Sequence, residues 1–285
     1  MFHEFVGPHI QFKLKRGPRT EDSLHWKLPP PPAARHGVVA VRPKPFRFDL
    51  ARRAGGGGEE EMRFTASPVV ELPVGGAVLT FEQDNDSFEV GTSVWPSSLV
   101  LVKFVERCLR DPGLPFADVL RFPGTRAVEL GSGCGPAGLG LSRLGLTDLV
   151  LTDIAAVLPA LRRNLRRNRP HLPRAPRLAQ LHWNCPAHLA TLATPRRFDL
   201  VVAADVVYVQ ESVPHLIAAM DALADAERGV VLLGYQIRSP EAHQVFWDSV
   251  PAAFPVIEKV AREHLDPDYA YEESDVYILR RRPRQ

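Results

Sequence analysis

Residues 128–135 read Val128-Glu129-Leu130-Gly131-Ser132-Gly133-Cys134-Gly135, an apolar strand that runs directly into a turn rich in glycine. Glycine adopts positive φ without steric cost and lets the backbone come close to a ligand. A helix is expected to begin at Pro136, because proline suits the first helical position, where an N–H would lack an intrahelical partner anyway. Strand, glycine turn and helix in this order predict an α/β domain with a ligand-binding turn.

Short apolar stretches alternate with helical stretches on both sides of this turn. A first helix is expected around Leu99 to Leu109, where apolar residues recur at helical spacing before Asp111-Pro112-Gly113. Strands are expected at 127–130, 149–152, 178–183, 198–204, 230–234, 257–260 and 276–279, and further helices at 136–145, 155–168, 212–226 and 240–250. This alternation predicts a mainly parallel sheet with helices on both faces.

The chain divides into an N-terminal extension and a larger domain. Residues 1–63 contain a proline run at 29–32 and a glycine run at 55–58, which indicate a partly flexible extension. Residues 64–285 are expected to form the main domain. It should open with a β-hairpin, because two alternating stretches, 68–72 and 77–81, flank the turn-forming pair Gly75-Gly76.

Composition narrows the class of protein further. The 285 residues carry a formal net charge of +2, which argues against a dedicated nucleic-acid binder. The three cysteines are widely spaced, and their pattern indicates neither a disulfide framework nor a metal site. The N-terminal stretch lacks the apolar core of a signal peptide, and no run reaches the roughly 18 apolar residues of a spanning helix. We expect a cytoplasmic protein, with the nucleus as a further location, and no contact with membranes.

Several separated motifs carry a family resemblance in the same order and spacing. They are Val94-Trp95-Pro96, residues 129–133, Asp153, Leu181-His182-Trp183-Asn184, and residues 198–208, which end in Asp205-Val206-Val207-Tyr208. Together they resemble methyltransferase-like family 16 of the protein-lysine methyltransferases, from about residue 68 to 282. The resemblance implies the Rossmann-like, seven-stranded class I methyltransferase fold, S-adenosylmethionine as cofactor, and methyl transfer to a lysine side chain of a protein.

The resemblance also assigns roles to particular residues. Asp205 and Tyr208 would face the methyl group and its acceptor. The cofactor would be surrounded by Trp95, Gly131, Gly133, Asp153, Trp183 and Ala204, and we add Glu129 and Ser132 from the strand and the glycine turn. Tyr235 follows a later strand at the same edge of the sheet, so we expect it to line the lysine channel. The reaction requires no metal, because the methyl group of a sulfonium is already activated.

Other readings of these residues remain open. Gly133, Gly135 and Gly138 also fit a dinucleotide fingerprint, with Asp153 about 20 residues further on as the ribose-binding carboxylate. Glu129 within the strand and the earlier Gly131 favour the methyltransferase form of the turn. A protein-histidine acceptor, or a non-catalytic protein that binds the cofactor and serves as an interaction partner, is also compatible with the motifs.

An RNA substrate is a further alternative, because arginines cluster between residues 162 and 177. RNA methyltransferases more often carry Asn/Asp-Pro-Pro-aromatic where this chain has Asp205-Val206-Val207-Tyr208, which favours a protein substrate. The resemblance suggests a chaperone, an AAA-type ATPase or a translation factor as that substrate. We expect the enzyme to act as a monomer.

Overall fold

A computed structural model of the chain describes residues 67–281, except residues 85, 88, 118, 121 and 123. Its centre is a seven-stranded sheet in the order β5-β4-β3-β6-β7-β9-β8. The strands are β3 (Arg126–Leu130), β4 (Asp148–Asp153), β5 (Arg177–Gln180), β6 (Leu200–Ala204), β7 (Val230–Tyr235), β8 (Val256–Lys259) and β9 (Asp275–Arg280). Strands β3 to β7 are parallel, and β9 runs antiparallel to β7 and β8. The predicted Rossmann-like methyltransferase fold is confirmed.

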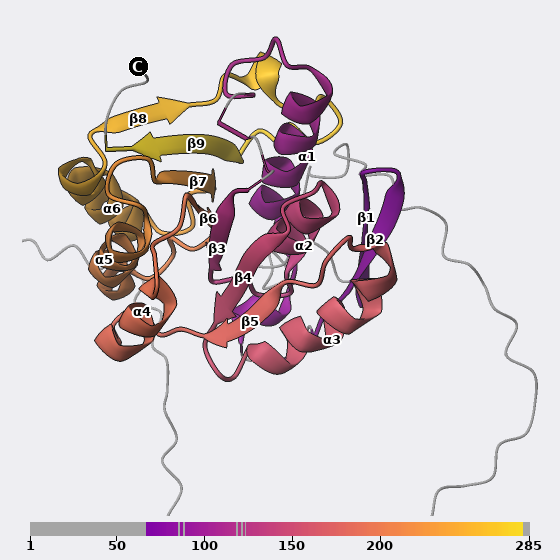
Figure 1. Cartoon of the computed structure of the whole chain (residues 1–285), viewed down its shortest axis with the longest axis horizontal. Coiled ribbons are helices and arrows are strands. Elements are labelled where there is room, and N and C mark those ends of the chain that lie inside the picture. The colour runs from indigo at the N-terminus through magenta and orange to yellow at the C-terminus, as the bar shows by residue number, and fades with distance from the viewer. Residues whose placement is uncertain are drawn as a thin grey trace, which may run out of the picture. The chain divides into compact units, whose positions relative to one another are not determined.

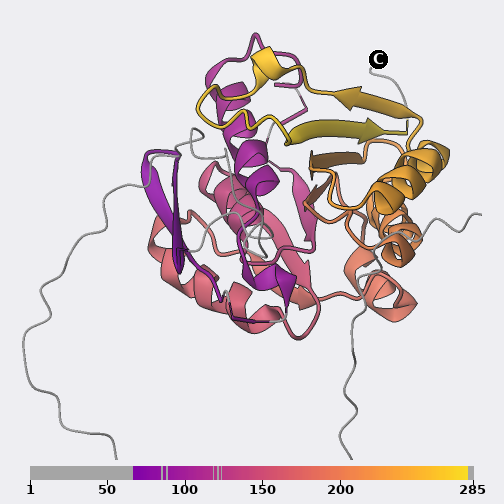
Figure 2. The same cartoon turned by 180° about the vertical axis from the view of Figure 1, so that it is seen from behind.

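Helices cover both faces of the sheet (Figures 1 and 2). One face carries α1 (Pro96–Arg110), α2 (Pro136–Arg143) and α3 (Leu158–Asn168), and the other carries α4 (Pro186–Ala193), α5 (Val213–Leu223) and α6 (Pro240–Ala253). Side chains of a strand alternate between the two faces. Val202 therefore packs into the core under α1 and α2, whereas Val201 and Ala203 pack into the core under α5 and α6. Each face thus has its own apolar core.

A β-hairpin precedes the sheet domain, as predicted. Strands β1 (Val69–Val74) and β2 (Ala77–Glu82) pair antiparallel, and both turn residues, Gly75 and Gly76, have positive φ. This conformation suits a two-residue hairpin turn and favours glycine. Alternate residues of β2 bond to two asparagine side chains of α3. The Asn168 amide pairs with the N–H and C=O of Thr80, both at 2.8 Å, and the Asn164 amide pairs with those of Glu82 at 2.8 and 3.0 Å.

Two predictions for the region between β4 and β6 were wrong. The strand expected over 178–183 ends at Gln180, because β5 is an edge strand that pairs only with β4 before the chain turns away. Trp183 consequently lies beyond the strand. The helix α4 was missed, because its eight residues lie among prolines and threonines typical of loops. Its Leu189 and Leu192 pack against the second core, so tertiary burial stabilises this short helix.

The prediction for residues 1–63 lies outside the described residues. Within residues 67–281, apart from the exceptions above, no helix combines the length and the apolar character that crossing a membrane requires. The same part of the chain contains no group of three or more histidine, cysteine or acidic residues arranged to hold a metal ion.

Candidate active site

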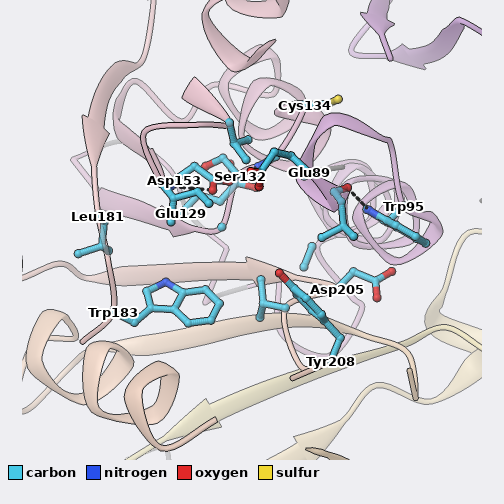
Figure 3. Close-up of a pocket in the computed structure, with 18 of the residues that line it drawn as sticks. Glu89, Trp95, Glu129, Ser132, Cys134, Asp153, Leu181, Trp183, Asp205 and Tyr208 are labelled. Carbon is cyan, nitrogen blue, oxygen red and sulfur yellow. Dashed lines mark hydrogen bonds between the residues drawn. The ribbon is translucent and has the colours of Figure 1, made fainter. Parts of the chain in front are cut away.

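A cavity of about 300 Å³ opens at the carboxyl ends of β3, β4 and β6. Ligands bind at this edge of open α/β sheets, because the loops there leave a crevice. All the predicted site residues except Tyr235 line it (Figure 3): Trp95, Glu129, Gly131, Ser132, Gly133, Asp153, Trp183, Ala204, Asp205 and Tyr208. Folding therefore brings together residues from five separate stretches of the sequence.

The glycine turn forms the inner wall of the cavity. Gly133 has φ +53°, and a Cβ atom added there would lie 2.9 Å from the carbonyl oxygen of Gly91. Asp153 holds the turn in place, because its Oδ2 accepts a hydrogen bond from the Gly133 N–H at 2.7 Å. Its Oδ1 accepts from the N–H of Ile154, also at 2.7 Å. The conformation of the glycine turn therefore depends on glycine at position 133 and on the Asp153 carboxylate, which bonds the backbone of the turn.

Glu129 is a buried acid in the wall of this cavity. Glu129 is a residue of β3 and is 2% exposed. Its Oε2 has no hydrogen-bond partner among the described residues. Burial raises the pKa of Glu129 to about 8, and the negative charge of Asp153 acts in the same direction. This oxygen is enclosed against Gly138, so Glu129 shapes the wall of the cavity beside the glycine turn.

Apolar groups form the opposite wall. Trp183 lies in the turn after β5, and its indole extends along the cavity below the glycine turn (Figure 3). A Cβ atom at Gly131 would lie 3.4 Å from this ring and 2.9 Å from Val206. Gly131 therefore lets the backbone approach the apolar wall closely. The flat face of Trp183 suits stacking against an aromatic base.

Asp205 lies at the end of β6 in a left-handed backbone conformation, with φ +59°. Its side chain is 2% exposed, and both oxygens accept hydrogen bonds from Arg238, at 2.7 Å each. The Arg238 guanidinium lies 4.6 Å from the ring centroid of Trp95. Trp95 in turn donates from Nε1 to the Val90 carbonyl at 3.0 Å. Arg238, which the sequence did not point to, thus joins Asp205 to Trp95 and the loop of Val90 on the other side of the cavity.

Tyr208 lies beside Asp205 at the mouth of the cavity, and its hydroxyl group points inward (Figure 3). Partial burial raises the pKa of Tyr208, and so do the carboxylates of Asp153, Glu89 and Asp205. The phenol therefore stays protonated at neutral pH and can donate a hydrogen bond.

The structure does not place Tyr235 in the channel. It is 3% exposed and packs against Phe246, Trp247 and Tyr277, with its hydroxyl group 2.8 Å from Nδ1 of His243. The expectation overlooked the alternation of β7: Gly234 faces α1, where a Cβ would meet the Ser97 carbonyl, so the next residue points toward α6.

Some lining residues escaped the sequence analysis. Glu89, Val90 and Gly91 come from the loop and 3-10 helix η3 (Val90–Thr92), which lies over the glycine turn, and His182 and His215 also line the cavity. No short pattern marks the η3 loop, because Gly91 meets Gly133 and Val157, which lie far from it in the sequence. Arg238 had one available signal, its position just after β7 at the ligand-binding edge.

The charge of the cavity discriminates between ligands. Four carboxyl groups line it, those of Glu89, Glu129, Asp153 and Asp205. Glu129 is mostly protonated at neutral pH because its pKa is raised, and Arg238 balances the charge of Asp205. Glu89 and Asp153 therefore supply the negative charge, which suits the ammonium and sulfonium groups of S-adenosylmethionine and disfavours the pyrophosphate of a dinucleotide. The glycine turn and the indole of Trp183 fit this cofactor as well. Fold and cavity together define a class I methyltransferase that uses S-adenosylmethionine.

Sequence comparison specifies the family. A family model described as lysine methyltransferase matches residues 75–252. The chain belongs to this family, which confirms the predicted activity, S-adenosylmethionine-dependent methylation of lysine. Two mouse relatives are similar at 27% identity. EEF1A lysine methyltransferase 3 aligns over 69% of this chain and 74% of its own length, and protein N-lysine methyltransferase METTL21A over 76% and 88%.

A solved structure supports the fold independently. The 16S rRNA N2 G1207 methyltransferase RsmC of T. thermophilus, in complex with AdoMet and guanosine, superposes with a TM-score of 0.51 at 21% identity. The match covers 75% of this chain and 50% of that chain, so this chain spans half the length of that protein. At this identity the similarity shows the fold alone.

Proposed function

We propose that this enzyme methylates a lysine side chain on another protein, with Asp205 and Tyr208 at the point of transfer. The observation that carries the proposal is the position of these two residues at the mouth of an acidic cavity, next to the glycine turn. A lysine side chain is cationic and long, and carboxylates at the mouth would attract it and guide it inward.

The residues proposed to hold the cofactor are Trp95, Glu129, Asp153, Trp183, Ala204 and the turn from Gly131 to Gly133. Bound S-adenosylmethionine supplies a methyl group that its sulfonium has already activated. The protein then has two tasks, to orient the acceptor nitrogen and to exclude water. The apolar wall of Trp183 and Val206 serves the second task.

The acceptor must lose a proton before transfer, because lysine has a reference pKa of about 10.4 and only the neutral amine carries a lone pair. An isolated carboxylate would stabilise the ammonium form and so oppose this loss. Asp205 is not isolated, since Arg238 balances its charge. The pair can orient the amine by hydrogen bonding with little bias toward its charged form. Tyr208 would narrow the channel and contact the same nitrogen.

The proposal extends to the class of substrate protein, the oligomeric state and the cellular location. We infer a substrate among translation factors, chaperones or AAA-type ATPases; the name of one relative, EEF1A lysine methyltransferase 3, supports the first class. We further propose a monomeric enzyme of the cytoplasm, with the nucleus as a second location. Residues 64–285 would form the catalytic domain, and residues 1–63 an extension to it.

The test compares the wild-type chain with Asp205→Asn. Asparagine keeps the shape of the side chain and tolerates positive φ, so the backbone of this position is retained. Each protein is incubated with tritiated S-adenosylmethionine and a lysate whose endogenous methylation was blocked, with and without RNase. Asp248→Ala, which removes an exposed carboxylate on α6, is the matched control.

We expect discrete labelled protein bands that resist RNase, map to methyl-lysine, persist in Asp248→Ala and weaken at least tenfold in Asp205→Asn. Binding of S-adenosylhomocysteine by each variant, measured by calorimetry, shows that the site remains folded. Label on histidine would change the acceptor, and RNase-sensitive label would change the substrate class. Cofactor binding without any label would contradict the proposed activity.

A further inference from the structure

Large apolar side chains are exposed at only six positions among the described residues, and they are unevenly distributed. Two lie apart from the cavity, Val78 on β2 and Leu109 near the end of α1. The other four are Val90, Tyr208, Val209 and Ile237, with exposed fractions between 40% and 57%. They come from three loops that follow each other around the mouth of the cavity. We call these four residues the apolar rim.

The members of the rim are linked through their neighbours in the three loops. Val90 and Tyr208 line the cavity themselves, and Val209 follows Tyr208. Ile237 precedes Arg238, whose guanidinium bonds Asp205 and lies over Trp95. Trp95 closes the circle, because its Nε1 donates to the Val90 carbonyl. The loop after β6, the loop after β7 and the η3 loop therefore meet around the Asp205 carboxylate.

Exposed apolar side chains that gather around a polar site mark a surface for a macromolecule. A nucleic acid would require basic groups at this mouth. The ionisable side chains that line the cavity are Glu89, Glu129, Cys134, Asp153, His182, Asp205, Tyr208 and His215, and Arg238 beside it is already paired with Asp205. The arginines of α3 lie elsewhere, and Arg163 and Arg167 pair with Glu82 on the hairpin. The carboxylates suit a lysine side chain, and the apolar side chains around them suit apolar residues next to that lysine in the substrate.

We propose that the apolar rim is the docking surface for the protein substrate, and that the target lysine lies in a segment flanked by apolar side chains. This inference rests on the proposed function and specifies its substrate class. The lysine enters between Asp205 and Tyr208, while its apolar neighbours pack on Ile237, Val209 and Val90. Burial of these side chains supplies the affinity, because the ion pair leaves little free charge for binding.

The test uses Ile237→Asp and Val209→Asp, two exposed rim positions that do not line the cavity. The matched control is Val78→Asp, which introduces the same charge at a similarly exposed position on β2. The probe is the lysate with blocked methylation, labelled with tritiated S-adenosylmethionine at subsaturating lysate concentrations. S-adenosylhomocysteine binding is measured for each protein, and methyl-lysines made by the wild type are mapped by mass spectrometry.

We expect each rim variant to lose at least tenfold in initial labelling rate through a higher KM, with S-adenosylhomocysteine binding within about twofold of the wild type. Val78→Asp should label at the wild-type rate, and the mapped lysines should have apolar neighbours. Rim variants that label as fast as Val78→Asp would overturn the docking surface while leaving the proposed function intact. Absence of methyl-lysine with the wild type would overturn the proposed function and this inference with it.

Discussion

The carboxylate of Asp205 and the guanidinium of Arg238 form a two-point ion pair, with Oδ1 to Nε and Oδ2 to Nη2 distances of 2.7 Å each. The carboxylate is almost fully buried, whereas the arginine side chain is one-quarter exposed. Such a bidentate ion pair fixes the orientation of the carboxylate and favours its ionised form. The pair also joins β6 to the loop after β7 and, through Trp95, to the start of α1. The acceptor end of the cavity is therefore organised before substrate arrives.

Arg238→Gln should reveal the dependence of Asp205 on its partner. The substitution leaves a buried carboxylate without its counter-charge, and we expect the free energy of unfolding to fall by about 1–3 kcal/mol, reduced from the cost of a fully buried pair because Arg238 meets solvent. Urea unfolding of Arg238→Gln, Asp205→Asn and the double variant measures the coupling between the two residues. Strictly additive losses would show that the ion pair contributes no coupling.

Gly133→Ala should impair cofactor binding. The added Cβ would lie 2.9 Å from the Gly91 carbonyl at a positive φ, so the turn or the η3 loop must shift. We expect S-adenosylhomocysteine affinity, measured by calorimetry, to fall at least tenfold. Gly76→Ala is the control, because it has a similar φ with no atom near the added Cβ. Equal affinities in the two variants would mean that close approach at Gly133 is unimportant.

Glu129 should make stability depend on pH. Its folded pKa of about 8 lies above the ordinary glutamate value of 4.5. Between these values the native state holds a proton that the unfolded chain has released, so the free energy of unfolding should fall as pH rises through this window. The upper limit is about 1.4 kcal/mol per pH unit. In Glu129→Gln this contribution is absent, and urea unfolding at a series of pH values should give a flatter profile. Parallel profiles would refute the raised pKa.

Asn164→Leu should destabilise the contact between the hairpin and α3. The buried amide donates to the carbonyls of Glu82 and Cys134 at 3.0 and 3.1 Å, and it accepts from the Glu82 N–H. Leucine would leave these backbone groups without partners, at a cost of about 2–4 kcal/mol in urea unfolding. Gln244→Leu removes an exposed amide on α6 and should change stability by less than about 0.5 kcal/mol. A similar small change for Asn164→Leu would contradict this role.

The elements that the sequence predicted are those whose causes are local. The turn from Gly131 to Gly135 requires positive φ, the pair Gly75-Gly76 suits a two-residue hairpin, and the alternation of apolar strands with helices implies a parallel sheet. Asp205 and Tyr208 were recognised because they belong to one short motif. In each case the chemistry depends on residues within a few positions of one another.

Other features arose only from the tertiary structure. Arg238 meets Asp205 across 33 positions of sequence, and Gly91 of the η3 loop meets Gly133 of the glycine turn. Tyr235 points to α6 because of its register in β7, and α4 is helical because its leucines are buried. Contacts between distant segments depend on how the two faces of the sheet are covered. Short-range spacing and residue preference do not encode that information, so the rim and the ion pair became visible only in three dimensions.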